Sequence, residues 1–63
     1  MDKIVKILKD QIDEKVDLLA NSISDGRAKD YAEYQKLCGE IRGLRTARQY
    51  ITLLNQELDE LDE

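Results

Sequence analysis

The stretch SDGRAKDYAE, residues 24–33, separates two segments of periodic apolar residues and decides how the chain folds. Gly26 suits the left-handed position that follows the C-terminus of a helix. Four residues later Asp30 can cap a new helix, and Glu33 can reach back to it in an acidic variant of the capping box. We therefore predict a first helix ending near residue 25, a turn over about 26–30, and a second helix beginning near Tyr31.

The segment before this turn has the apolar spacing of a nearly undistorted helix. Its apolar residues follow an eleven-residue repeat of about 3.67 residues per turn. They are Met1, Val5, Leu8, Ile12, Val16, Leu19 and Ile23. This pattern predicts a helix over about residues 2–25. A second ridge lies about a quarter turn away, and it either widens the core face or contacts another chain; it consists of Ile4, Ile7 and Leu18.

The segment after the turn has a longer apolar stripe and no stop signal before about residue 61. Its members are Tyr34, Leu37, Ile41, Leu44, Ala47, Ile51, Leu54, Leu58 and Leu61. Four of them keep the seven-residue interval of a left-handed coiled coil: Leu37, Leu44, Ile51 and Leu58. A short loop makes consecutive helices antiparallel neighbours. We predict an all-α, coiled-coil-like antiparallel hairpin that occupies residues 1–63 as one domain, with the second helix, about 31–61, the longer.

Two glycines interrupt the second helix, and each costs about 1 kcal/mol relative to alanine in a helix interior. If residue i faces about residue 55 − i across the turn, three branched side chains face three small residues: Leu8, Ile12 and Val16 opposite Ala47, Gly43 and Gly39. Small residues let two helices approach closely, which increases dispersion contacts. We predict a helix-packing strip here; the alternative is a kink or an exposed face that accommodates a partner.

The same register leaves residues 55–63 beyond the first helix. Leu58 and Leu61 would then have no partner within the chain, and a hairpin this small buries little apolar surface alone. We expect a homo-oligomer, or docking on a larger protein, through a set of apolar residues: Leu53, Leu54, Leu58, Leu61, Ile4, Ile7 and Leu18. The alternative is that the residues after Leu54 fray.

The composition gives no indication of an active site. Cys38 is the only cysteine and histidine is absent, so neither an internal disulfide nor a zinc site can form. No phosphate loop or nucleotide motif is present, and two helices enclose no pocket that could shift a carboxylate pKa. We expect Cys38 to be an inert thiol, and Tyr31, Tyr34 and Tyr50 to be amphipathic edge residues. We predict no enzyme activity, no cofactor, no metal and no small-molecule substrate.

The charge is unevenly distributed along the chain. The net charge is −4, made of −2 over residues 1–26, +3 over 27–48 and −5 over 49–63. A negative net charge argues against a nucleic-acid-binding protein. No apolar run approaches the roughly 20 residues of a membrane span, and the charged N-terminal residues do not resemble a signal peptide. A lone cysteine then indicates a reducing cytoplasm.

Three arginines at three-residue steps form the one basic cluster: Arg42, Arg45 and Arg48. They are a solvated or salt-bridging face, a source of an ion pair between subunits, or a phosphate contact. Arg48 falls where a residue of the helix seam is expected, so we include it in the candidate interface with an acidic group on a neighbouring chain.

The stretch AKDYAEYQKLCGEIRGLRTARQYI, residues 28–51, resembles small helical proteins of tailed bacteriophages, especially short-tailed ones. Those proteins share a core similar to DYAEYQKLCGEIRGL, and the resemblance supplies no catalytic residues. It implies a virion structural or assembly protein near the portal or head–tail junction, with a larger phage protein as partner. It is equally consistent with a small effector of a host protein, which would use its acidic C-terminal segment. Either protein would occur in the host cytoplasm during infection, and the first also in the virion.

Overall fold

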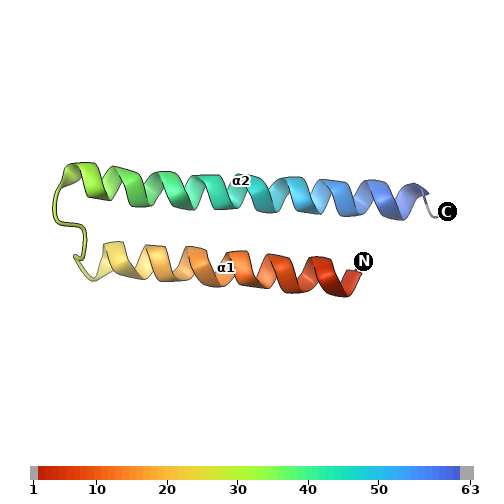
Figure 1. The fold of residues 1–63 in the computed structure, drawn as a ribbon, viewed down its shortest axis with the longest axis horizontal. Helices are drawn as coiled ribbons and strands as arrows, with labels where there is room; N and C mark the ends of the chain where they lie inside the picture. Colours follow the sequence, from red (N-terminus) through yellow and green to blue (C-terminus); the bar gives the residue numbers. More distant parts are fainter. Residues whose placement is uncertain (1, 62–63) are drawn as a thin grey trace.

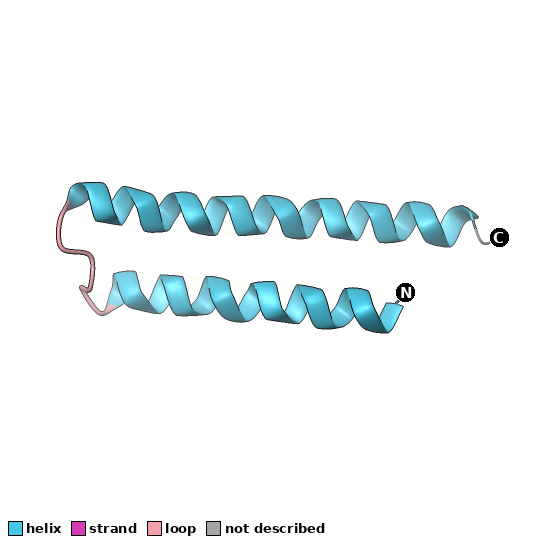
Figure 2. Ribbon diagram, in the orientation of Figure 1, coloured by secondary structure: helices cyan, strands magenta, loops and turns pink. Residues whose placement is uncertain are grey.

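The chain forms an antiparallel helical hairpin in a computed structural model that describes residues 2–61. Helix α1 spans Asp2–Ser24 and helix α2 spans Tyr31–Leu61. The two helices lie side by side, and α2 extends past the N-terminus of α1 at the end opposite the turn (Figure 1). Figure 2 shows only helix and loop over the described residues. The rod measures 51 × 17 × 11 Å. The predicted all-α hairpin with a longer second helix is confirmed.

The end of α1 is closed by a Schellman motif centred on Gly26. The Arg27 amide donates a hydrogen bond to the Ser22 carbonyl at 3.0 Å, and the Gly26 amide donates to the Ile23 carbonyl at 3.0 Å. Gly26 has a φ of 73°, in the left-handed region that a side chain disfavours. These bonds satisfy carbonyls that the helix end would otherwise leave unpaired. The left-handed position predicted for Gly26 is confirmed.

The start of α2 is capped by two acidic side chains. The Glu33 amide donates to Asp30 Oδ1 at 2.8 Å, which is the predicted N-cap bond. The Glu33 carboxylate in turn accepts from the Lys29 amide at 3.2 Å. It therefore reaches one residue further back than a standard capping box would place it. Both bonds fix the direction in which the chain enters α2.

The core lies in the half of the hairpin nearer the turn. Val16, Leu19 and Ile41 are 9%, 7% and 8% exposed, and they are the only buried hydrophobic residues in the part of the chain that the structure describes. Four half-buried side chains pack against them: Ile12, Ile23, Leu37 and Leu44. Most of the predicted stripes therefore form the seam, while Met1 lies outside the described residues. Five members of the predicted stripes are exposed instead: Leu8, Tyr34, Ala47, Leu54 and Leu61.

The register between the helices differs from the predicted one. Arg48 bonds to Asp13, so the contacting positions sum to 48 + 13 = 61 rather than 55. The reason is that helical side chains lean toward the N-terminus of their own helix. In an antiparallel pair, side chains of α1 lean away from the turn and those of α2 lean toward it. A residue of α1 therefore meets a residue of α2 that lies farther from the turn than backbone levels suggest.

Of the predicted helix-packing strip, the close approach at the glycines is wrong, because Gly39 and Gly43 project about 140° and 100° around α2 from Leu44, which packs against the core. A Cβ atom added to Gly39 or Gly43 would meet no atom within 4 Å, so neither glycine is required by close approach of α1. Val16 and Ile12 belong to the core that contains Ile41. The two remaining members of the strip are exposed: Leu8 and Ala47. The alternative prediction for the glycines, an exposed face, describes Gly43, while Gly39 is half-buried.

The overhang of α2 is shorter than predicted. Asn55 lines a groove together with Asp2 and Val5, so α1 still lies beside α2 at that level. Leu58, predicted to have no partner in the chain, is half-buried, whereas Leu61 is exposed. Residues 55–61 are helical, so the alternative of fraying after Leu54 is wrong for that range, and residues 62–63 lie outside the described residues.

Candidate interaction surface

Large apolar side chains gather on the outside of the hairpin at the end opposite the turn. On one side of the hairpin, those of α1 are Ile4 and Leu8, which are 67% and 42% exposed; Ile7, 50% exposed, projects about 100° away from Leu8. Those of α2 are Tyr50, Leu54 and Leu61, which are 67%, 54% and 80% exposed. We call Ile4, Leu8, Tyr50, Leu54 and Leu61 the open-end apolar face. Exposed apolar surface of this kind marks contact sites in soluble proteins.

A groove between the helices shows that both halves of this face lie on one side of the hairpin. The groove has a volume of about 500 Å³ and is lined by Lys15, Leu19, Glu40, Gly43 and Leu44. At about 100° per residue, Lys15 projects from α1 in nearly the direction of Ile4 and Leu8. Gly43 lies about five full turns before Leu61 on α2 and points the same way. The open-end apolar face therefore continues into this groove.

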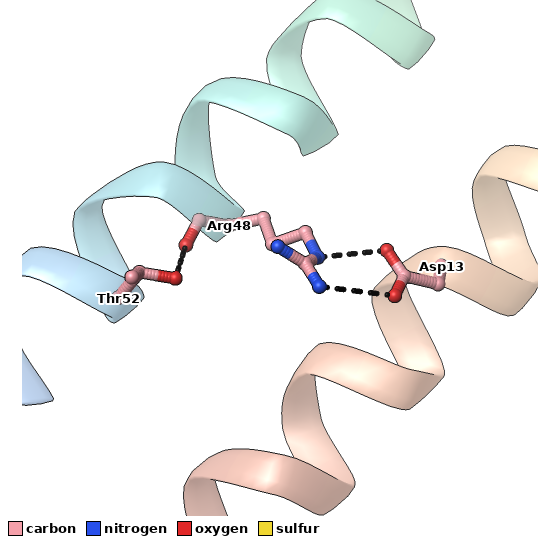
Figure 3. A network of polar contacts seen from close by, with 3 residues as sticks. All are labelled: Asp13, Arg48 and Thr52. Atoms are coloured by element: carbon pink, nitrogen blue, oxygen red, sulfur yellow. Dashed lines mark hydrogen bonds and ion pairs between the residues drawn. The ribbon is translucent and has the colours of Figure 1, made fainter.

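The opposite side of the hairpin is polar and is fixed by one ion pair. Arg48 Nε donates to Asp13 Oδ1 at 2.8 Å and Arg48 Nη2 donates to Asp13 Oδ2 at 3.3 Å, as Figure 3 shows. Thr52 Oγ1 donates to the Arg48 carbonyl at 3.1 Å, which anchors the same turn of α2 (Figure 3). Asp13 lies about 140° around α1 from Leu8, on the other flank of the seam.

This ion pair corrects the prediction for Arg48, whose partner is in the same chain and not in a neighbouring one. The sequence contained a signal for it, because Asp13 follows Ile12 directly at the edge of the seam. With contacting positions that sum to 55, Asp13 is not expected to face Arg48. A second groove, of about 320 Å³, follows on the same polar side; it is lined by Asp2, Val5, Lys6, Lys9, Asp10, Arg48 and Asn55. The two remaining arginines of the cluster are exposed: Arg42 and Arg45.

The structure separates the other predicted interface residues from one another. Ile4, Ile7 and Leu18 are exposed, so this ridge does not widen the core as one interpretation held. Leu18 lies near the turn and away from the open-end apolar face. Leu53 is 48% exposed but projects from α2 about 100° away from Leu54. Tyr50 takes its place beside Leu54, as expected of an amphipathic edge residue.

The polar groups of the hairpin offer no activated centre. No ionisable side chain among residues 2–61 is buried. No group of three or more metal-ligating side chains occurs in that range either. A side-chain hydrogen bond with the neighbouring Cys38 thiol raises the pKa of Tyr34 above its ordinary value. Near the turn, the rings of Tyr31 and Tyr34 meet edge to face at 6.2 Å between centroids. Chemically, the arrangement is suited to contacting other apolar surfaces.

Neither α1 nor α2, over the residues described, is apolar and long enough to cross a membrane. Comparison of the chain with protein-family models, with curated proteins and with solved structures finds no match. The resemblance of residues 28–51 to small phage proteins therefore stays a prediction.

Proposed function

We propose that this chain is a non-enzymatic assembly protein that binds other protein subunits through its open-end apolar face. The observation that carries the proposal is the surface left uncovered by the hairpin. The chain exposes 5153 Å², whereas a compact folded chain of 7.3 kDa exposes about 4,200 Å². The hairpin is elongated, 51 × 17 × 11 Å, so more of its apolar surface stays exposed than in a compact chain of the same mass.

The composition of the open-end apolar face supports a protein partner. Interface cores are enriched in aromatic and large apolar residues and depleted in charge. Tyr50 and Leu54 lie on α2 between Gly43 and Leu61, and Ile4 and Leu8 lie on the same side of α1. Desolvating these exposed side chains on a partner is the largest favourable contribution available to this chain outside its own small core.

The resemblance of residues 28–51 to small phage proteins suggests where such binding occurs. We propose a virion, with the hairpin docked on larger proteins of the portal or head–tail region. In that setting the protein needs no enclosed cavity and no catalytic group.

Mass spectrometry of purified phage particles tests this proposal. We expect the chain in particles at a fixed ratio to the portal protein, Leu54→Glu to reduce its incorporation at least tenfold, and Leu53→Glu to leave it unchanged. Leu53 is the matched control because it neighbours Leu54 and is similarly exposed, but lies outside the face. Absence of the wild-type chain from particles would overturn the virion role.

A second candidate function is an effector that binds a host protein through its acidic end. Glu57, Asp59 and Glu60 are exposed at the end of α2, where anionic groups can imitate a nucleic-acid backbone. This role predicts that affinity for one host protein falls steeply with salt. It also predicts that Glu57→Gln with Glu60→Gln weakens binding while Leu54→Glu does not, which is the reverse of the assembly role.

A further inference from the structure

We propose that a second copy of the chain covers the open-end apolar face, turned end for end by a two-fold axis, with Leu61 of each copy seated in the Gly43 groove of the other. The pairing deepens the proposed function and rests on it, because it names the first subunit that the face binds. It makes a short four-helix segment from two hairpins whose turns point in opposite directions.

The spacing along α2 makes the face self-complementary. Gly43 and Leu61 are 61 − 43 = 18 residues apart, which is about five full turns, so both point to the same side of α2. Their midpoint is residue 52. Tyr50 and Leu54, the exposed apolar residues between them, have the same midpoint, (50 + 54)/2 = 52. A two-fold axis perpendicular to α2 at residue 52 therefore relates the apolar residues to one another.

This axis makes two kinds of contact between the α2 helices. Tyr50 of one copy lies opposite Leu54 of the other, and Leu61 lies opposite Gly43. On α1, Ile4 and Leu8 lie level with the same segment, since Val5 and Asn55 line one groove. Across the axis they lie opposite the α1 helix of the other copy. An isologous interface of this kind closes after two copies.

The Gly43 groove is open to an incoming side chain. No atom lies within 4 Å of a Cβ built at Gly43, and the groove extends over about 500 Å³ beside Leu19 and Leu44. Leu61 is 80% exposed, and nothing in the hairpin shelters it. A leucine entering this groove replaces its own water contacts and those that the half-buried Leu44 retains. This pairing also accounts for a glycine in the middle of α2 that intrachain packing does not require.

One charge pair agrees with the same pairing. The axis places residues 57–60 of one copy level with residues 44–47 of the other, beside the Lys15 that lines the groove. Glu57, which is exposed and projects only about 40° from Leu61, is the acidic side chain of that segment nearest to this Lys15. Glu40 also lines the groove, and Arg48 is held on the opposite side by Asp13.

Sedimentation equilibrium of the full chain tests the pairing. We expect a monomer–dimer equilibrium in the wild type, a dissociation constant raised at least tenfold by Leu54→Glu, and no change with Leu53→Glu. Circular dichroism of each variant reports whether the helices persist. A wild-type chain that stays monomeric at millimolar concentration, or equal weakening by both variants, overturns the inference.

Disulfide trapping tests the register independently of stability. In a Cys38→Ser background, Gly43→Cys and Leu61→Cys chains are mixed and oxidised. We expect the mixed disulfide to exceed either homodimer at least fivefold. Gly43→Cys mixed with Leu53→Cys is the control and should show no such preference. Equal yields in the two mixtures would overturn the two-fold arrangement.

The two experiments also separate this inference from the proposed function. If the purified chain is monomeric but Leu54→Glu is still lost from phage particles, the assembly role holds and the second copy is wrong. If the chain dimerises through Leu54 but is absent from particles, the pairing holds and the virion role is wrong.

Discussion

The two halves of the hairpin differ in how far they bury their apolar side chains. Near the turn, Leu19 and Ile41 bury each other's surface, and the Gly26 and Asp30 caps satisfy both helix ends. At the open end the helices still lie side by side, but Ile4, Leu54 and Leu61 face outward. Composition does not explain the contrast, because the open end is equally rich in large apolar residues.

The contrast shows that two packed helices bury apolar side chains along only one line of contact. Each helix carries a second group of apolar residues about a quarter turn from the first, and a single neighbouring helix cannot cover both. The apolar side chains of the turn-side half pack against each other within the chain. Those of the open-end half stay exposed and are available to another subunit. Helices of four-helix bundles carry comparably wide apolar faces.

The largest difference in stability should appear when one apolar side chain is truncated in each half. Ile41→Ala should lower the free energy of unfolding by about 2–5 kcal/mol, because it removes a core side chain and leaves a cavity. Leu54→Ala should change it by only about 0.5 kcal/mol at protein concentrations where the chain is monomeric. Urea unfolding followed by circular dichroism measures both values. Equal losses would mean that the open end is as well packed as the turn side.

Replacing glycine by alanine should change the free energy of unfolding in opposite directions at two positions of the hairpin. Gly39→Ala should raise the free energy of unfolding by about 1 kcal/mol, because the added Cβ meets no atom and alanine favours helix. Gly26→Ala is the control and should lower it by about 1 kcal/mol, because Gly26 has a positive φ. Thermal unfolding of the two variants gives both signs. A loss at Gly39 would instead restore the close-packing role predicted from the sequence.

The smallest expected effect belongs to the ion pair on the polar side. Asp13 and Arg48 are partly exposed, so a double-mutant cycle with Asp13→Asn and Arg48→Gln should give a coupling energy of about 0.2–1 kcal/mol. The coupling should shrink in high salt, because exposed charges are screened. Sedimentation of Arg48→Gln should match the wild type. A weakened dimer in that variant would return Arg48 to the interface between subunits.

Much of the hairpin was predictable because its signals are local. The left-handed glycine, the Asp30 cap and the 3.6-residue periodicity act over a few residues each, so the helix bounds and the antiparallel topology follow from the sequence. Exposure of the second ridge on α1 was open between two interpretations. Periodicity assigns residues to a face of a helix, but it does not say how far a neighbouring helix covers that face.

The amino-acid sequence is enough to predict two helices, one turn and the apolar stripes along them, since backbone hydrogen bonding and side-chain periodicity are properties of neighbouring residues. The register depends on how the helices pack, because side-chain lean shifts the contacting residues along both helices at once. That shift placed Arg48 against Asp13. The rotation of each helix about its own axis left Gly43 outside the seam and put Tyr50, Leu54 and Leu61 on the same side of the hairpin as Ile4 and Leu8.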